Sequence, residues 1–315
     1  MSTLLISHPC FVRHDTGYGH PERADRMRAL DKVFEHETFV ALRREEAPLR
    51  DDLEQAVLRA HPQAHYDAIV TSKPDPDSDE TVHLDADTII SPGSWEAASR
   101  AVGAGLHAVD RVMAPSGDIK NVFCQVRPPG HHAETSKAMG FCLFNSIAIA
   151  ALYARATYGM DRVAVIDFDV HHGNGTQDIF WQDRNLYFGS THQMPLYPGT
   201  GALAETGAGN IFNAPLRPDD DGGPFREAFE SRILPSLDAF RADLILISAG
   251  FDAHANDPLA NLRLVEEDFR WATNKLLDLA ARHCDGRVVS MLEGGYDLEG
   301  LAQSAAAHVS ALMSA

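Results

Sequence analysis

The sequence has few cysteines and places none of them close to another. Its four cysteines are Cys10, Cys124, Cys142 and Cys284, and no C-x-x-C spacing occurs. This pattern indicates neither a thiolate zinc site nor a redox motif, and we interpret all four as reduced thiols. The chain also lacks any run of 18 apolar residues, so it predicts no membrane-spanning segment.

Basic residues are in short supply relative to acidic ones. The 315 residues include 27 Lys and Arg against 45 Asp and Glu, for a formal net charge of −18. This balance disfavours direct binding of nucleic acid and favours the approach of cationic substrates or basic peptides. The start of the chain, "MSTLLISHPC", lacks the basic region and cleavage site of a secretion signal. We therefore expect a cytoplasmic protein.

What the chain does contain is an alternation of short apolar runs and stretches with helical periodicity. The apolar runs lie at 3–7, 121–126, 163–170, 185–190, 243–250 and 287–292, and the helical stretches lie at 22–36, 93–112, 143–158, 224–240, 266–283 and 298–313. Strands without polar alternation are typical of a sheet covered by helices on both faces. The predicted fold class is therefore α/β, a three-layer α/β/α domain with a mainly parallel sheet. No break divides residues 1–315, and only "TSKPDPDSDET" at 71–81 has the composition of an exposed loop.

Polar motifs follow four of the predicted strands. These motifs are "RPPGHHAE", "DFDVHHGNG", "AGFDAHANDP" and "LEGGYDL". Ligands of open parallel sheets bind outside the carboxyl ends of the strands. We therefore expect the four motifs to converge on one crevice.

The segment "VAVIDFDVHHGNGTQ" at 163–177 ends in ionisable residues where an apolar strand would end. Counting in twos, Asp167, Asp169 and His171 project from one face if the strand stays extended. Two buried carboxylates side by side need a cation or must be protonated. The segment therefore predicts a metal site, although a strand-end turn with capping carboxylates is the simpler alternative.

Asp169, His171 and Asp252 make a plausible set of nitrogen and oxygen ligands with one position open for water or substrate. Zinc fits this set, and ferrous iron, cobalt or manganese are possible substitutes. For Asp252 alone, a tight turn after Gly-Phe is an alternative explanation.

The "PPG" turn leads into adjacent histidines, His131 and His132. Adjacent histidines are often incidental, but Asp167 shares a strand end with the proposed ligands and could accept the Nδ1 proton of one ring, and Asn174 could accept that of the other. An Asp partner raises the pKa of an imidazole, whereas an Asn fixes the tautomer without adding charge, so the pair would separate an imidazolium from a neutral base.

In "EGGYD", Gly295 permits close approach to a ligand, and the Tyr296 hydroxyl is a candidate donor to an oxyanion or simply a packed aromatic.

Seven motifs in order along the chain resemble the histone deacetylase family, and they cover nearly all of it. They are "HPERADR", "RPPGHHA", "GFCLFN", "DFDVHHGNGTQ", "YPGTG", "SAGFDAHANDPL" and "LEGGYDL". Asn174 and "LEGGY" resemble the class II branch and its bacterial relatives, including the acetylpolyamine amidohydrolases.

The resemblance implies the arginase/deacetylase fold, with zinc on Asp169, His171 and Asp252. It implies that His131 pairs with Asp167, that His132 pairs with Asn174 and that Tyr296 polarises the acyl carbonyl. A narrow acyl-lysine channel would be lined by Gly140, Phe141, Tyr197 and Gly295. Arg26 would lie near an internal exit cavity, and a structural potassium ion would lie near Asp167, Asp169, His171 and Ser190. Tyr197 departs from the phenylalanine that is common in the eukaryotic enzymes.

The predicted function is metal-assisted hydrolysis that removes acetyl groups from acetylated amines, such as acetyl-lysine in peptides or acetylpolyamines, with His132 as general base. A binuclear ureohydrolase resembling arginase would need a second cluster of the Asp-x-His-x-Asp kind. The other alternative is a catalytically silent module that binds acyl-lysine. The natural substrate and the oligomeric state are open at this point.

Overall fold

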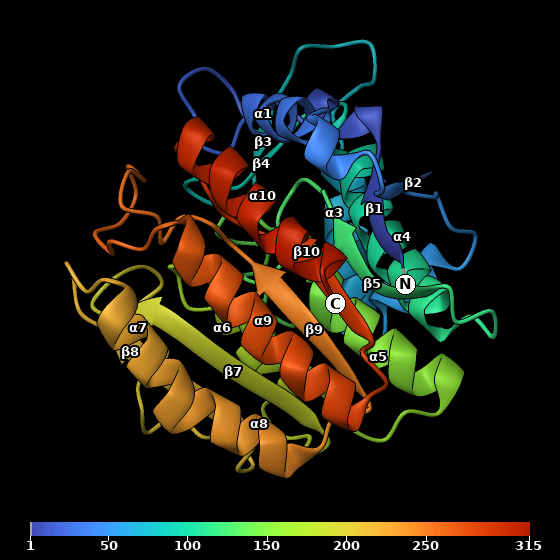
Figure 1. Ribbon diagram of the computed structural model, residues 1–315. Coiled ribbons are helices and arrows are strands. Elements are labelled where there is room, and N and C mark those ends of the chain that lie inside the picture. Colours follow the sequence, from blue (N-terminus) through green and yellow to red (C-terminus); the bar gives the residue numbers. More distant parts are fainter. Residues whose placement is uncertain (1) are drawn as a thin grey trace.

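The computed structural model describes residues 2–315 and is built around a sheet of eight parallel strands (Figure 1). In spatial order the strands are β2 (Arg43–Glu46), β1 (Ser2–Ser7), β5 (Ile119–Cys124), β10 (Val288–Leu292), β9 (Leu244–Ala249), β6 (Val163–Asp167), β7 (Leu186–Gln193) and β8 (Ile211–Leu216). Every neighbouring pair in this sheet is parallel. A separate antiparallel pair joins β3 (Val82–His83) to β4 (Ile89–Ile90).

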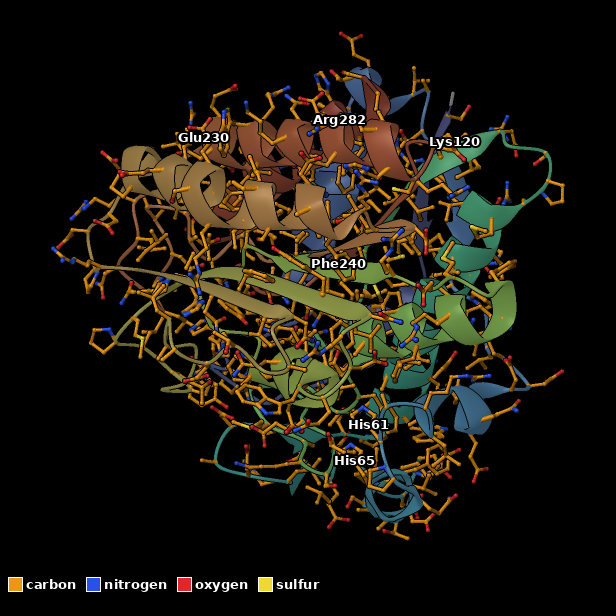
Figure 2. All side chains as sticks on the ribbon, turned by 90° about the horizontal axis from the view of Figure 1, so that it is seen from below. His61, His65, Lys120, Glu230, Phe240 and Arg282 are labelled. Carbon is orange, nitrogen blue, oxygen red and sulfur yellow. The ribbon has the colours of Figure 1, made fainter. Side chains whose placement is uncertain are left out.

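Helices cover both faces of the sheet, as Figures 1 and 2 show. One layer consists of α1 (Asp25–Phe34), α7 (Gly222–Ala228), the π-helix η3 (Phe229–Ile233), α8 (Leu234–Phe240), α9 (Glu266–His283) and α10 (Leu298–Met313). The opposite layer contains α4 (Ser94–Met113), α5 (Ser146–Tyr158) and α6 (Asn174–Phe180), with α2 (Leu53–Val57) packed against it. Near this layer lies α3 (Gln63–Thr71), and the short 3₁₀ helices are η1 (Pro9–Arg13) and η2 (Glu37–Phe39). The predicted three-layer α/β/α architecture is confirmed.

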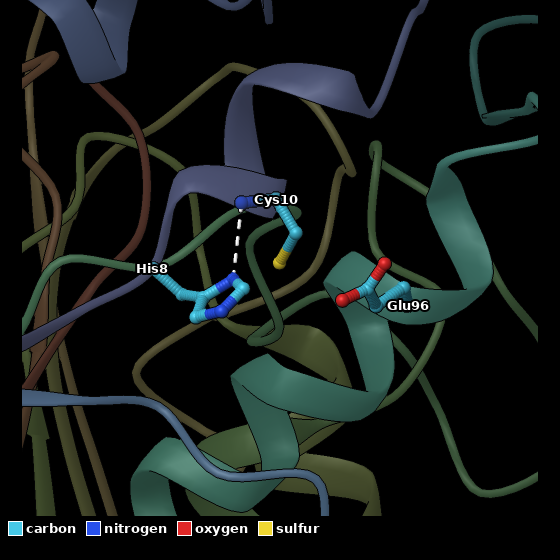
Figure 3. A group of neighbouring side chains, drawn as sticks. All are labelled: His8, Cys10 and Glu96. Atoms are coloured by element: carbon cyan, nitrogen blue, oxygen red, sulfur yellow. Dashed lines mark hydrogen bonds between the residues drawn. The ribbon is translucent and has the colours of Figure 1, made fainter.

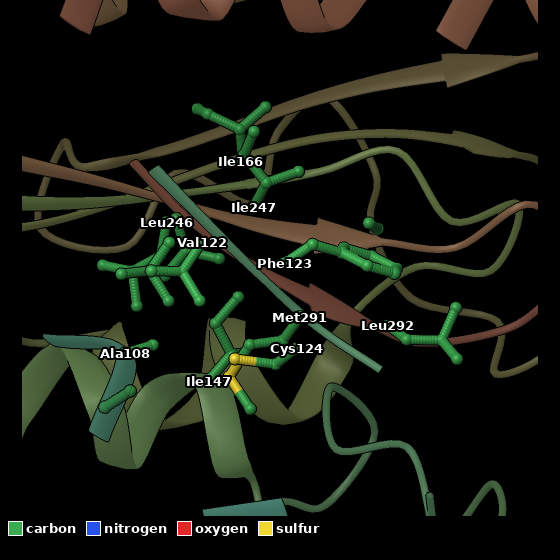
Figure 4. Packing of buried hydrophobic residues seen from close by; sticks show 14 of the residues in the cluster. Ala108, Val122, Phe123, Cys124, Ile147, Ile166, Leu246, Ile247, Met291 and Leu292 are labelled. Atoms are coloured by element: carbon green, nitrogen blue, oxygen red, sulfur yellow. The ribbon is translucent and has the colours of Figure 1, made fainter. Parts of the chain in front are cut away.

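The central strands are buried on both faces, which explains their unbroken apolar sequences. Every residue of β6, β9 and β10 is buried. Figure 4 shows side chains such as Val122, Leu246 and Met291 packed against Ala108 of α4 and Ile147 of α5. Such dry packing on both sides is the usual environment of parallel sheets. It holds the carboxyl ends of β5, β10, β9 and β6 side by side.

The six strands predicted from apolar runs are present, but two further strands of the main sheet and the short β3–β4 pair were missed. β2 reads "RREE" and lies at the edge of the sheet, where charged side chains face water. β8 is the opposite edge strand and contains Pro215. Edge strands carry weaker apolar signals because one side has no neighbouring strand. Of the predicted loop at 71–81, Thr71 is the last residue of α3, and the rest contains neither helix nor strand and is largely exposed.

No helix within residues 2–315 combines the length and the apolar character that crossing a bilayer requires.

Candidate active site

The first group of site residues lies where β6 ends. The strand stops at Asp167, whose neighbours in register are Ser190 of β7 and Ser248 of β9. Beyond it the chain turns: Asp169 N donates to Asp167 Oδ1 at 3.0 Å, and His171 N donates to Asp169 Oδ1 at 2.9 Å. The strand is therefore three residues shorter than the predicted run 163–170, and the condition of an extended chain through His171 is not met. Carboxylates that accept from the backbone two residues ahead form the turn instead.

Asp169, His171 and Asp252 form a buried cluster of donor atoms that lie within 4.8 Å of one another. His171 Nδ1 is 3.2 Å from Asp169 Oδ1 and 3.1 Å from Asp252 Oδ2. Two glycines leave room for the carboxylates. A Cβ at Gly250 would lie 2.0 Å from Asp169 Oδ2, and one at Gly294 would lie 2.2 Å from Asp252 Oδ2. The predicted ligand set is thus brought together from the ends of β6 and β9.

The chemistry of this cluster fits a divalent cation. Burial and the charge of Asp169 raise the pKa of Asp252 to about 7. Burial acts to lower the pKa of His171, but hydrogen bonds to Asp169 and Asp252 outweigh it and raise the pKa to about 10. Two carboxylates and one imidazole held this closely repel or share protons unless a cation neutralises them. They are also the ligand types of catalytic zinc sites.

A second donor group, which the sequence did not suggest, consists of His8, Cys10 and Glu96 (Figure 3). His8 Nδ1 accepts a hydrogen bond from Cys10 N at 3.1 Å. Both carboxylate oxygens of Glu96 already accept from guanidinium groups, one from Arg13 at 2.6 Å and the other from Arg100 at 3.0 Å. Because two cations already neutralise this carboxylate, we do not count the group as a partner centre of a binuclear site.

The rings of His131 and His132 lie close together, with centroids 4.0 Å apart and planes tilted by 45°. His131 Nδ1 donates to Asp167 Oδ2 at 2.9 Å, and His132 Nδ1 donates to Asn174 Oδ1 at 2.7 Å. All four side chains are buried. The "PPG" turn therefore brings both rings inward, each against the partner expected from the sequence.

The two rings differ in basicity. Burial acts to lower the pKa of His131, but the charges of Asp167 and Asp169 outweigh it and raise the pKa well above its ordinary value. For His132, burial and the neighbouring charges of His131 and His171 lower the pKa well below the ordinary value. The two shifts run in opposite directions, and they favour an imidazolium at His131 and a neutral imidazole at His132.

The Asn174 side chain fixes the tautomer of His132. Its Nδ2 donates to Glu134 Oε1 at 2.7 Å and contacts Met139 Sδ at 3.4 Å, which leaves Oδ1 to face His132. An amide oxygen only accepts, so His132 Nδ1 must carry the proton. The lone pair of His132 is consequently on Nε2.

These groups adjoin a cavity of about 380 Å³. Its lining consists of His20, Pro21, Asp87, His132, Gly140, Phe141, His171, Leu196, Tyr197, Leu259 and Tyr296. Phe141 packs edge-on against Tyr296 with centroids 5.9 Å apart, and Tyr197 packs edge-on against His132 at 5.2 Å. Tyr197 is 39% exposed, whereas Tyr296 is 9% exposed. The cavity thus runs from an accessible wall to a buried phenol beside the donor cluster.

Three of the four predicted channel residues line this cavity. Gly140 has φ 55°, and a Cβ there would lie 2.5 Å from His132 Cδ2, so only glycine fits. Phe141 also has a positive φ, of 70°. Gly295 is the exception, because it does not belong to the lining of this cavity. Its carbonyl accepts from Arg26 Nε at 2.6 Å, on the other side of the Tyr296 segment.

Arg26 is fully buried beneath Tyr296. Its guanidinium lies 5.0 Å from the centroid of the Tyr296 ring, donates to the Glu293 carbonyl at 2.5 Å and pairs with Glu22 at 3.0 Å. These contacts hold the segment that carries Tyr296. The exit cavity that the resemblance implies beside Arg26 stays a prediction.

The residues predicted for potassium surround the end of β6. Asp167 and Asp169 belong to the turn described above, and Ser190 lies beside Asp167 on β7. Ser190 Oγ is 2.8 Å from His192 Nδ1. These oxygen atoms suit a hard monovalent cation, and the potassium site also stays a prediction.

Sequence reasoning missed several residues of the site. Glu293 is buried and accepts from Gly130 N at 2.6 Å and from His131 N at 3.1 Å, and burial raises its pKa to about 7. His20 and Leu259 belong to motifs that were recognised, so membership of those motifs was an available signal. Asp87 lies outside every motif, and the local sequence gave no sign that it reaches the cavity.

The chain is similar to known deacetylases along almost its whole length. Residues 20–312 match the histone deacetylase domain. The chain is 38% identical over 292 residues to a histone deacetylase-like amidohydrolase of Pseudomonas aeruginosa, covering 91% of this chain and 75% of that protein. It is 35% identical over 310 residues to a probable deacetylase of Archaeoglobus fulgidus, covering 95% and 83% respectively.

Solved structures agree with these relatives. The crystal structure of the HDA15 HD domain superposes with a TM-score of 0.91 at 34% identity, covering 99% of this chain and 88% of that one. The three-layer architecture is therefore the arginase/deacetylase fold. Together with the family match from His20 to Leu312, this establishes that the chain belongs to the histone deacetylase family.

Proposed function

We propose that the protein is a zinc-dependent amidohydrolase that removes acetyl and related acyl groups from acylated amines and releases the carboxylate and the free amine. One observation carries the proposal: the Asp169–His171–Asp252 cluster, the His132 imidazole and the Tyr296 phenol all adjoin the same cavity. Family membership supports hydrolysis of an amide. It also supports residues 1–315 acting as one deacetylase domain.

Zinc would be held by Asp169, His171 and Asp252, where it would polarise the acyl carbonyl and lower the pKa of the attacking water. Iron or cobalt would suit the same ligands. Gly250 lies against the Asp169 carboxylate and Gly294 lies against the Asp252 carboxylate. Any larger residue at either position would occupy the space that the carboxylate needs.

The chain's own residues would move the protons. His132 Nε2, uncharged and oriented by Asn174, takes a proton from the water as its oxygen attacks the carbonyl carbon. The Tyr296 hydroxyl donates a hydrogen bond to the oxygen that becomes negative. When the C–N bond breaks, an imidazolium gives its proton to the departing amine. His131 is the histidine that its carboxylate neighbours keep charged.

The cavity suits a slender chain that ends in an amide. Phe141 and Tyr197 supply aromatic walls, and Asp87 adds a carboxylate to the lining. Acetyl-lysine in peptides and acetylpolyamines both present an alkyl chain with cationic or polar groups behind the amide. We therefore propose these two as the substrate class.

The rival functions predict different behaviour. A ureohydrolase needs two metal ions together, and among residues 2–315 the only other donor group is the one neutralised by two arginines. A silent binding module would bind acyl-lysine without turnover. The test is hydrolysis of N-acetylputrescine, an acetyl-lysine coumarin peptide and arginine by protein loaded with zinc. Release of acetate from the acetylated amines supports the proposal, whereas urea from arginine or binding without turnover would overturn it.

A further inference from the structure

Two histidines outside the cavity, His61 and His65, contact the loop that carries its Phe141 wall. Figure 2 labels both histidines. His61 lies just before α3, and His65 lies in its first turn. They are 1% and 5% exposed, and their rings stack with centroids 4.5 Å apart at an interplanar angle of 19°. Both rings also pack beside Phe144. We call residues 135–145, which include Gly140 and Phe141, the wall loop.

The two histidines bond to backbone groups at both ends of the wall loop. His61 Nε2 accepts from Asn145 N at 3.0 Å, so the neutral ring carries its proton on Nδ1 and donates to the Thr135 carbonyl at 3.1 Å. His65 Nε2 donates to the Leu143 carbonyl at 2.9 Å. The side chains of His61 and His65 therefore hold the two ends of the wall loop together. We call these three hydrogen bonds, to Thr135, Leu143 and Asn145, the neck of the loop.

The loop depends on such external contacts. Within it, Met139 and Cys142 form only an isolated bridge. Phe141 adopts a left-handed backbone with φ 70°, which a phenylalanine holds only where its surroundings impose it. Phe141 N donates to Thr88 Oγ1 at 3.1 Å, and Thr135 N donates to Asp178 Oδ2 at 2.9 Å. The bonds from His61 and His65 add to these anchors and are the ones that reach Leu143 O and Asn145 N. If the neck opens, Phe141 and Gly140 lose their position against His132.

We propose that His61 and His65 are positioning residues for the substrate channel, setting the width of the cavity through the wall loop without touching the substrate. The inference rests on the proposed function of the cavity. Neither histidine is among the cavity-lining residues or the donor cluster. Their contribution is therefore expected in substrate binding and acyl selectivity more than in the chemical step.

His65 offers a clean pair of variants. His65→Phe keeps a ring beside His61 and Phe144 but has no donor for the Leu143 carbonyl, whereas His65→Gln places an amide donor close to the position of Nε2. We expect His65→Phe to raise KM for an acetyl-lysine peptide about tenfold, with kcat changed less than about threefold, because small displacements of positioning groups have large effects. The kcat/KM ratio of acetyl to butyryl substrates should shift, and His65→Gln should restore both values.

Hydrogen exchange of backbone amides 136–144 supplies a readout that needs no turnover. Exchange should become faster in His65→Phe and return toward wild type in His65→Gln. His308→Gln is the matched control: His308 is a fully buried histidine bonded to Thr273 and Ser290, in the opposite helix layer. It should leave wall-loop exchange and the acyl ratio unchanged. If His65→Phe does not fold, His61→Asn tests the same neck, because it removes the acceptor of Asn145 N.

The possible results separate the two proposals. Suppose that wall-loop exchange is faster in His65→Phe but the wild type turns over no acylated amine. That result would support the role of His61 and His65 in holding the wall loop and would overturn the proposed function. Suppose instead that the wild type turns over acylated amines and that wall-loop exchange, KM and the acyl ratio are all unchanged in His65→Phe. That result would overturn the proposed positioning role of the two histidines.

Discussion

Glu134 Oε1 accepts a 2.7 Å hydrogen bond from the side-chain amide of Asn174, and that bond decides which end of the amide faces His132. An asparagine side chain turned by 180° would present NH₂ to His132 Nδ1. The Nδ1 proton would then have to move to Nε2, where the proposed base needs its lone pair. Glu134, which is only partly buried, thereby orients His132, the proposed general base, through the uncharged Asn174 side chain.

Replacing Glu134 should consequently affect proton transfer while leaving the metal in place. We expect Glu134→Ala to lower kcat about 10- to 100-fold, the usual effect of losing a residue that orients a site group. Glu134→Gln retains an acceptor for Asn174 and should stay within about threefold of wild type. Steady-state kinetics and metal analysis of both variants make the comparison. Equal loss in Ala and Gln would show that the charge of Glu134, rather than the orientation of Asn174, matters.

The Tyr296 hydroxyl is the proposed donor to the oxyanion. Removing one such donor typically costs about 10² to 10³ in rate. Tyr296→Phe should lower kcat by about that factor because the ring and its packing against Phe141 and Arg26 remain. Metal content should not change, and hydroxamates should still bind, though more weakly. Near-normal turnover would make the phenol a packing residue.

Metal stoichiometry distinguishes the two donor groups. The protein should carry about one transition metal per chain, lose activity to a chelator and regain it with zinc, cobalt or iron. Asp252→Ala should lose both metal and activity. Cys10→Ser, in the arginine-neutralised group, should keep both. Two equivalents of metal that are both needed for turnover would favour the ureohydrolase.

Asp87 lines the cavity, and the whole chain has a net charge of −18. If acidic charge attracts the substrate, kcat/KM for N-acetylputrescine should fall with added salt more steeply than kcat/KM for an uncharged acetamide of equal length. Asp87→Asn should reduce the difference between the two slopes. Identical slopes in the wild type would assign the acidic surface to solubility alone.

His308 should make unfolding sensitive to acid. Burial lowers its pKa from 6.5 to about 3. Between these two pH values His308 is therefore mainly protonated in the unfolded chain and mainly neutral in the folded chain. Stability from this group is therefore present above pH 6.5 and is lost progressively as the pH falls toward 3, at about 1.4 kcal/mol per pH unit. Between pH 6.5 and 5, the free energy of unfolding of His308→Gln should fall less than that of the wild type, by about 2 kcal/mol. Urea titrations at several pH values measure the difference, and parallel curves would contradict the assignment.

Much of the fold was predictable because the central strands are buried on both faces and so carry uninterrupted apolar runs. The charged edge strand β2 and the proline-containing β8 gave no such signal. Parallel strands also place their carboxyl ends together, so the convergence of Asp169, His131, Asp252 and Tyr296 could be inferred without knowing the strand order.

The missing site residues are those fixed by contacts distant in sequence. Glu293 accepts from the backbone amides of Gly130 and His131, which lie 163 and 162 residues away and are groups that nearly any residue possesses. Asp87 reaches the cavity from the turn between β3 and β4, which lies outside the main sheet. The end of β6 was misplaced for a different reason: alternation in twos continues through Asp169, but hydrogen bonds from the backbone to the carboxylates compete with the ladder there.

The position of β10 has a consequence for synthesis on the ribosome. This strand comes last of the eight along the chain, yet it inserts between β5 and β9 near the middle of the sheet. Until residues 288–292 have emerged, β5 and β9 each present an unpaired edge, and the Tyr296 segment is absent. A nascent chain in this state exposes strand edges that invite pairing with other chains. The growing polypeptide should therefore depend on chaperones until β10 has been synthesised.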